Sequence, residues 1–177
     1  MLGISDYKKG IIMYAVINNS LYWYQRFRGK NIIIARNGQP VDDSFVSSGE
    51  GIFKKDVDTN SRDISDIYNV HFYVMYKDEA YPEQDTWAIG DGVSSDRPYR
   101  IEDGEVCISG FGAVSGNGWT TNGRDESSKI IRLSDCSKFW VEYKYTKKDG
   151  AMCSPEQVDK QEVSKEELVR KIVEHRV

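Results

Sequence analysis

Three short apolar segments separated by turn signals open the chain, and they constrain its fold more than any other feature. The segments are IIMYAVI at 11–17, LYWYQRF at 21–27 and NIIIAR at 31–36. The turn signals between and after them are Asn18 with Asn19, Gly29, and Asn37 with Gly38. Such residues tolerate the backbone of tight hairpins, and β-branched and aromatic side chains favour strands. The pattern therefore predicts an antiparallel meander.

The chain up to residue 150 continues this strand-like pattern. Further candidate strands lie at 69–77, 86–89, 98–102, 105–109, 129–134 and 138–146. Asp103 and Gly104 predict a tight hairpin between two of them. Residues 39–66 are polar and predict a long loop with at most one short helix near 61–67. With eight to ten strands, the expected fold is mainly β, α+β only at the margin, as an antiparallel β-sandwich or a partly open barrel.

The last part of the chain changes to a helical period. The segments SPEQ at 154–157 and SKEE at 164–167 each have the serine and the Gln or Glu of a capping box. A helical stripe of apolar residues follows: Leu168, Val169, Ile172 and Val173. We therefore expect a short C-terminal amphipathic helix, and a division into an antiparallel β domain at 1–150 and a helical appendage at 151–177 docked on it.

A glycine-rich stretch, GFGAVSGNGWTTNGR, occupies residues 110–124. Its glycine spacing matches neither the dinucleotide fingerprint nor a P-loop, because no lysine follows in register and no clear helix opens after it. Between strands, glycines at this density indicate turns and bulges. We therefore expect a flexible β-connection, with Trp119 folded over the sheet and Trp119 and Arg124 as candidates for partner binding.

A second candidate surface lies in the first hairpins. By the two-residue period of a strand, Tyr22, Tyr24, Arg26 and Arg28 share one face, and Lys30 follows them. Aromatic rings interleaved with cations can stack on bases and contact phosphates. If this face is exposed, the hairpin is a candidate for binding nucleic acid or another partner.

Motifs for metal binding and catalysis are weak in this sequence. Asp56, Asp58 and Asn60 alternate as at the start of a calcium loop, but Ser61 and Ile67 occupy the positions of its glycine and bidentate glutamate. His71 lies within a predicted strand and His175 lies in the last helical turn, where a cation is favoured anyway. The sequence thus predicts no cofactor and no catalytic residue, and it favours a protein that is not an enzyme.

Composition narrows the class of protein further. The net charge is −4, with six Lys/Arg and one Asp in residues 1–40 but four Lys/Arg and eleven Asp/Glu in 67–128. Three cysteines without paired spacing favour a reducing compartment, and the apolar run near the N-terminus is too short to span a bilayer. We expect a cytoplasmic protein with no membrane association.

By elimination, the leading functional hypothesis is a non-enzymatic, intracellular protein-binding module. It would act as an inhibitor, accessory or structural subunit, of the kind that viruses and mobile elements encode, by analogy of composition. The first alternative is a nucleic-acid-binding protein that uses the basic, aromatic N-terminal hairpin. The second alternative is a small-molecule site or an enzyme at residues 110–124.

Overall fold

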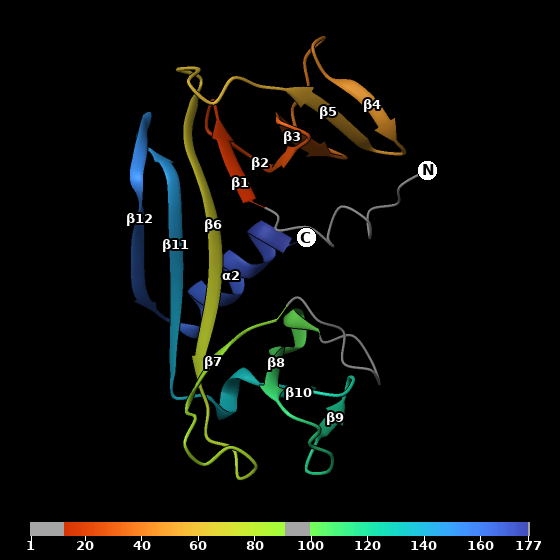
Figure 1. Cartoon of the computed structure of the whole chain (residues 1–177), viewed down its shortest axis with the longest axis vertical. Coiled ribbons are helices and arrows are strands. Elements are labelled where there is room, and N and C mark those ends of the chain that lie inside the picture. The colour runs from red at the N-terminus through yellow and green to blue at the C-terminus, as the bar shows by residue number, and fades with distance from the viewer. Residues whose placement is uncertain (1–12, 91–99, 177) are drawn as a thin grey trace. The chain divides into compact units, whose positions relative to one another are not determined.

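The computed structural model describes residues 13–90 and 100–176 (Figure 1). The chain forms two compact units: residues up to Val70 together with Tyr143–Asp159, and His71–Glu142 together with Lys160–Val177. The strands are β1 Met13–Ile17, β2 Ser20–Phe27, β3 Lys30–Arg36, β4 Val46–Gly49, β5 Ile52–Asp56, β6 Ile64–Met75, β7 Thr86–Ala88, β8 Glu105–Phe111, β9 Trp119–Thr121, β10 Glu126–Arg132, β11 Lys138–Lys148 and β12 Ala151–Val163. In the described part of the chain, helix α2 spans Lys165–Arg176.

The prediction of a mainly β, antiparallel fold with a short C-terminal helix is confirmed. One sheet has the hydrogen-bonded order β12-β11-β6-β1-β2-β3-β5-β4, with β7 also paired to β6, and a second sheet has the order β8-β10-β9. Since the first order ends at β12 on one side and β4 on the other, these described strands do not close into a barrel.

The N-terminal meander is confirmed from β1 onward, whereas the predicted residues 11 and 12 lie outside the described residues. Asn18 and Asn19 have φ of 48° and 63°, and Arg28 and Gly29 have φ of 50° and 76°. Two successive positive φ angles characterise the type I′ turn, whose twist matches that of the strands it joins. Tight turns at these positions set the register, with Tyr14 opposite Trp23 and Trp23 opposite Ile34.

The prediction of a long loop at 39–66 is wrong. This segment contains β4, β5 and the start of β6, and β5 pairs with β3 from Ile32↔Asp56 to Arg36↔Ile52. Both new strands are short and largely polar, so they lack a run of alternating apolar residues. The register of β1 with β6 shifts between Val16 and Ile17, which also breaks the two-residue period at the start of β6.

The predicted hairpin between 98–102 and 105–109 is also wrong. Residues 98 and 99 lie outside the described part, and Ile101–Asp103 form a single turn of 3₁₀ helix, η1, that ends at Gly104 with φ of 73°. The partner of β8 is instead β10, with Ile108 opposite Lys129. A second such turn, η2 at Leu133–Asp135, follows β10.

The core of the first unit contains the tyrosines that the sequence places on an open face. A cluster of buried residues joins β1, β2, β3 and β6: Ala15, Tyr22, Tyr24, Ile33, Ala35, Ile64 and Ile67. The Tyr22 hydroxyl donates to the Pro40 carbonyl at 2.8 Å, and the Tyr24 hydroxyl donates to Asn31 at 2.7 Å. Since Trp23 between them is buried as well, both faces of β2 are covered along this part of the strand.

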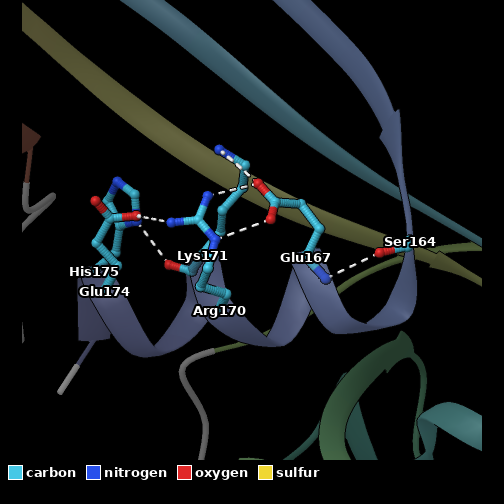
Figure 2. Close-up of polar contacts among 6 residues, drawn as sticks. All are labelled: Ser164, Glu167, Arg170, Lys171, Glu174 and His175. Carbon is cyan, nitrogen blue, oxygen red and sulfur yellow. Dashed lines mark hydrogen bonds and ion pairs between the residues drawn. The ribbon is translucent and has the colours of Figure 1, made fainter.

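Helix α2 begins at the second predicted capping serine (Figure 2). The Ser164 hydroxyl accepts the N–H of Glu167 at 3.1 Å, which satisfies one of the free donors of the first turn. On the exposed face, the Glu167 carboxylate accepts two hydrogen bonds from Arg170, at 2.9 and 2.6 Å. These bonds lower the pKa of Glu167 to about 2. The first predicted cap, at Ser154, is wrong because residues 151–163 form β12 and the helical part starts at Lys165.

The buried face of α2 differs from the predicted stripe. Leu168, Ile172 and His175 are buried, whereas Val173 is exposed. The His175 ring packs edge-on against Phe72 with centroids 6.0 Å apart, and its Nδ1 lies 2.7 Å from the Lys171 carbonyl oxygen (Figure 2). The ring therefore carries a proton on Nδ1 and fills an apolar position. Because His175 packs on Phe72, the helix docks on the unit to which it belongs. The predicted domain boundary near residue 150 stays a prediction.

Candidate functional site

A buried ion pair lies beneath the glycine-rich stretch. Lys129 of β10 donates to Asp78 at 2.6 Å, and the two side chains are 14% and 3% exposed. The other carboxylate oxygen of Asp78 accepts the indole N–H of Trp119 and the backbone N–H of Ala80, each at 2.9 Å. Asp78 thus ties β9 and β10 to the loop after β6.

The balance of burial and hydrogen bonding determines the charges of this pair. Burial alone would raise the pKa of Asp78, but the hydrogen bonds from Lys129, Trp119 and Ala80 outweigh it and hold that pKa below its ordinary value. Burial likewise disfavours the charged Lys129, yet its bonds to Asp78 and Tyr76 leave its pKa raised. Both groups are therefore charged near neutral pH.

Aromatic rings lie beside the pair, and one of them explains the glycine at position 110. Tyr81 packs against Trp87 and Trp119, with centroids 5.3 and 4.8 Å away, and its hydroxyl donates to the Phe111 carbonyl at 3.0 Å. A Cβ added to Gly110 would lie 2.4 Å from the Tyr81 ring. Gly110 is thus a glycine because the tyrosine lies directly over the β8 backbone.

The connection that follows β8 is held by a buried serine. The Ser127 hydroxyl accepts the N–H of Val114 at 2.7 Å and donates to the Gly112 carbonyl at 2.7 Å. The Thr121 hydroxyl donates to the Val114 carbonyl at 3.1 Å. Hydrogen bonds with Ser127 and Thr121 therefore anchor the stretch at several points, and the expectation that this connection is flexible stays a prediction.

This anchored frame presents one aromatic side chain to solvent. Phe111, at the end of β8, is 85% exposed. Next to it lies a shallow groove of about 620 Å³ lined by Ser109–Phe111 and Asn122–Glu126, which includes the exposed Arg124. We call this region the Phe111 surface. Phe111 is thus a large apolar side chain exposed on an anchored backbone, with polar residues around it.

The structure separates the sequence-predicted candidates of this region. Trp119 is buried, so its side chain supports the frame beneath the surface through its bond to Asp78. Arg124 lies on the Phe111 surface. Sequence reasoning missed Phe111, Asp78 and Lys129. The two-residue period provides a signal for Phe111, because Val106, Ile108 and Gly110 are buried on one face of β8 and Phe111 lies on the other.

In the N-terminal hairpin, the structure keeps the predicted cations exposed but not the tyrosines. Tyr22 and Tyr24 are each 6% exposed, so the expectation of an open tyrosine face is wrong. Arg26, Arg28 and Lys30 are exposed near the end of the hairpin. The physical reason is that the Tyr22 and Tyr24 rings pack on the core cluster, while the cations lie beyond it.

The weak metal candidates are satisfied by other groups. Asp56 forms an ion pair with Lys30 at 2.9 Å, and Asp58 accepts the backbone N–H of Asn60 at 2.9 Å. Over residues 13–90 and 100–176, no group of three or more His, Cys, Asp or Glu side chains is placed to hold a metal ion.

Two of the three cysteines lie in surroundings that disfavour the thiolate, the form of cysteine that acts as a nucleophile. Burial raises the pKa of Cys107, and it raises the pKa of Cys136 to about 12. His71 is exposed and lies near Tyr73, with ring centroids 6.5 Å apart, whereas His175 lies on the buried face of α2. A larger groove of about 750 Å³ lies at the start of α2, between η1 and η2, and its charged lining is mainly carboxylate.

The comparisons with known proteins add no relative. No family model, no curated protein and no solved structure matches the chain. Within the described part of the chain, no helix has the length and apolar character needed to cross a membrane.

Proposed function

We propose that this protein binds a protein partner through the Phe111 surface. The observation that carries the proposal is the exposed Phe111 ring on a backbone fixed from below by the Tyr81 hydroxyl. Buried aromatic and arginine anchors contribute most of the energy of many protein interfaces, and Phe111 and Arg124 are residues of these types. Exposing a phenyl ring to this degree gives no stability to the free protein.

The frame beneath the surface lowers the entropic cost of binding. The Asp78–Lys129 pair, Trp119 and the Ser127 hydroxyl hold the neighbouring backbone through bonds of 2.6 to 2.9 Å. A surface that is already ordered loses less conformational freedom on association than a flexible loop does. The binding surface is therefore preorganised rather than folded by its partner.

A role as an inhibitor, accessory or structural subunit in the cytoplasm agrees with these features. Cys107, Cys136 and Cys153 are all free, as expected in a reducing compartment. Burial raises the pKa of Cys107 and Cys136 and so disfavours their thiolate forms, whereas the exposed Phe111 ring supports a binding function.

The test is an affinity capture from a lysate of the organism that encodes the chain, followed by titration with the purified partner. Phe111→Ala should weaken the captured complex by about thirtyfold or more, since hot-spot truncations cost roughly 2 kcal/mol. Val46→Ala removes another exposed apolar side chain, 70% exposed on β4, and serves as the matched control. Equal capture by both variants would contradict the proposal, as would recovery of nucleic acid alone.

A further inference from the structure

The end of the β2–β3 hairpin carries a second surface that the Phe111 proposal does not use. It consists of Arg26, Phe27, Arg28 and Lys30, which we call the hairpin tip. Phe27 is 50% exposed and lies opposite Lys30 across the two strands. The guanidinium of Arg28 lies over the Phe27 ring, 5.1 Å from its centroid. One aromatic face and several cations therefore project together from a tight turn.

Few of the described acidic side chains neutralise the charges of this tip. Lys30 pairs with Asp56 at 2.9 Å, and both side chains are largely exposed. Within the described part of the chain, neither Arg26 nor Arg28 forms an ion pair. The turn residues Arg28 and Gly29 both have positive φ, which fixes the path of the backbone. Among the described residues, two guanidinium groups without an ion-pair partner thus lie two positions apart at the end of the hairpin.

We propose that the hairpin tip binds single-stranded nucleic acid. Arginine contacts phosphate groups through two parallel N–H donors, and an exposed ring provides a platform on which an unpaired base stacks. The Phe27 ring can take the role that Tyr22 and Tyr24, buried in the core, cannot. A paired base offers no free face to a ring at the end of a hairpin, so a single strand fits this tip better than a duplex. The proposal is independent of the Phe111 surface.

The expected salt dependence follows from the number of cations. Each phosphate contact on a single strand contributes about −0.7 to the slope of log K against log salt, so three cations give about −2. Arg26→Ala with Arg28→Ala leaves Lys30 alone and should flatten the slope to about −0.7. Phe27→Ala should weaken binding about tenfold while leaving the slope unchanged, because stacking on an aromatic ring does not release counterions.

The experiment is a fluorescence anisotropy titration of the full chain with labelled oligothymidine and oligouridine at several salt concentrations. The control for the double arginine variant is Arg62→Ala with Lys138→Ala. It removes two exposed cations elsewhere, so its net charge equals that of the double arginine variant. The expected result is weaker binding with a flatter salt slope in the tip variant but not in the control, together with the effect of Phe27→Ala.

Three results would overturn the proposal. The first is the absence of saturable binding to either oligonucleotide at low salt. The second is equal affinity of the two double variants, which would show that total charge and not the tip is responsible. The third is an affinity that Phe27→Ala does not change, combined with displacement of the oligonucleotide by heparin or an acidic protein as effectively as by unlabelled oligonucleotide. This result would identify a general anionic partner. Melting curves of each variant show that the fold is retained.

Discussion

Replacing Asp78 by Asn tests whether the buried ion pair holds the second unit together. Asn keeps an oxygen that can accept the N–H groups of Trp119 and Ala80, which now lie 2.9 Å from the carboxylate. It removes the negative charge that faces Lys129 at 2.6 Å. The substitution therefore changes charge at nearly constant shape.

The size of the effect follows from the burial of the two side chains. Removing one partner of a buried pair costs about 3–5 kcal/mol, because the remaining charge is uncompensated. The Lys129 ammonium keeps contacts with the Tyr76 and Trp119 rings, 5.5 and 5.9 Å from their centroids, and is 14% exposed. We therefore expect the lower end, about 3 kcal/mol, which corresponds to a fall in Tm of roughly 6–12 °C for a chain of this size.

The second half of the cycle is Lys129→Met. On its own it should cost about 3–5 kcal/mol, whereas the double variant should cost clearly less than the sum, because neither charge is then left buried without a partner. Urea unfolding followed by tryptophan fluorescence measures these differences, and Trp87 and Trp119 lie close to the pair. Additive single effects, or an Asp78→Asn variant within about 0.5 kcal/mol of the wild type, would refute the assignment.

The same pair predicts how stability depends on pH. The pKa of Asp78 is lowered in the folded state, so its contribution is complete above the unfolded value of about 4 and is lost as pH falls through the folded pKa. The pKa of Lys129 is raised, so its contribution is complete below about 10.4 and is lost as pH rises through the folded pKa. The stability difference between wild type and Asp78→Asn should therefore be largest near neutral pH and shrink in acid.

Three further predictions concern the frame of the Phe111 surface and the helix. Gly110→Ala should destabilise the protein by about 1–3 kcal/mol through the clash with Tyr81, and this cost should fall in a Tyr81→Ala background; an unchanged cost would contradict the contact. Ser164→Ala should cost about 1 kcal/mol in urea unfolding because the cap of α2 is lost, and a neutral variant would exclude that role. In hydrogen exchange, the amide of Val114, bound to Ser127, should be protected more than those of 115–118; uniform fast exchange across the stretch would show that the anchor does not form.

The strands that sequence reasoning found are those whose fold signal is local. In the N-terminal meander, apolar segments and turn residues sit side by side in the sequence, and Asn18 and Asn19 adopt the turn they indicate. Helix α2 was predictable because Ser164 caps it. Strands β4 and β5 were not, because they are short and become strands by pairing next to β3, which the sequence of either strand does not show.

Strand β12 shows why an edge strand can resemble a helix in sequence. Nearly all of its residues are exposed, and β11 is its neighbour at the end of the sheet. With neither face buried, a strand has no reason to alternate apolar and polar residues, so the two-residue period is absent. The serine at 154 then reads as a helix cap because serine and charged residues suit both settings. The two-residue alternation of apolar and polar residues indicates a strand with one buried face. It does not appear in a strand that has no buried face.

The candidate site depends on contacts that no sequence window contains. Lys129 and Asp78 are 51 positions apart, and Tyr81 reaches Phe111 across 30 positions. In the sequence alone each residue looks ordinary: Asp78 is an acidic loop residue, Lys129 is a lysine in a strand, and Tyr81 is a tyrosine after a turn. Their chemistry arises because antiparallel pairing of β8 with β10 brings Gly110 and Lys129 into one sheet, on which Tyr81 and Asp78 then pack. The glycine at 110 records this packing, since only a residue without a Cβ leaves room for the ring. The sequence therefore shows the glycine at position 110, but only the structure shows that the Tyr81 ring is the reason for it.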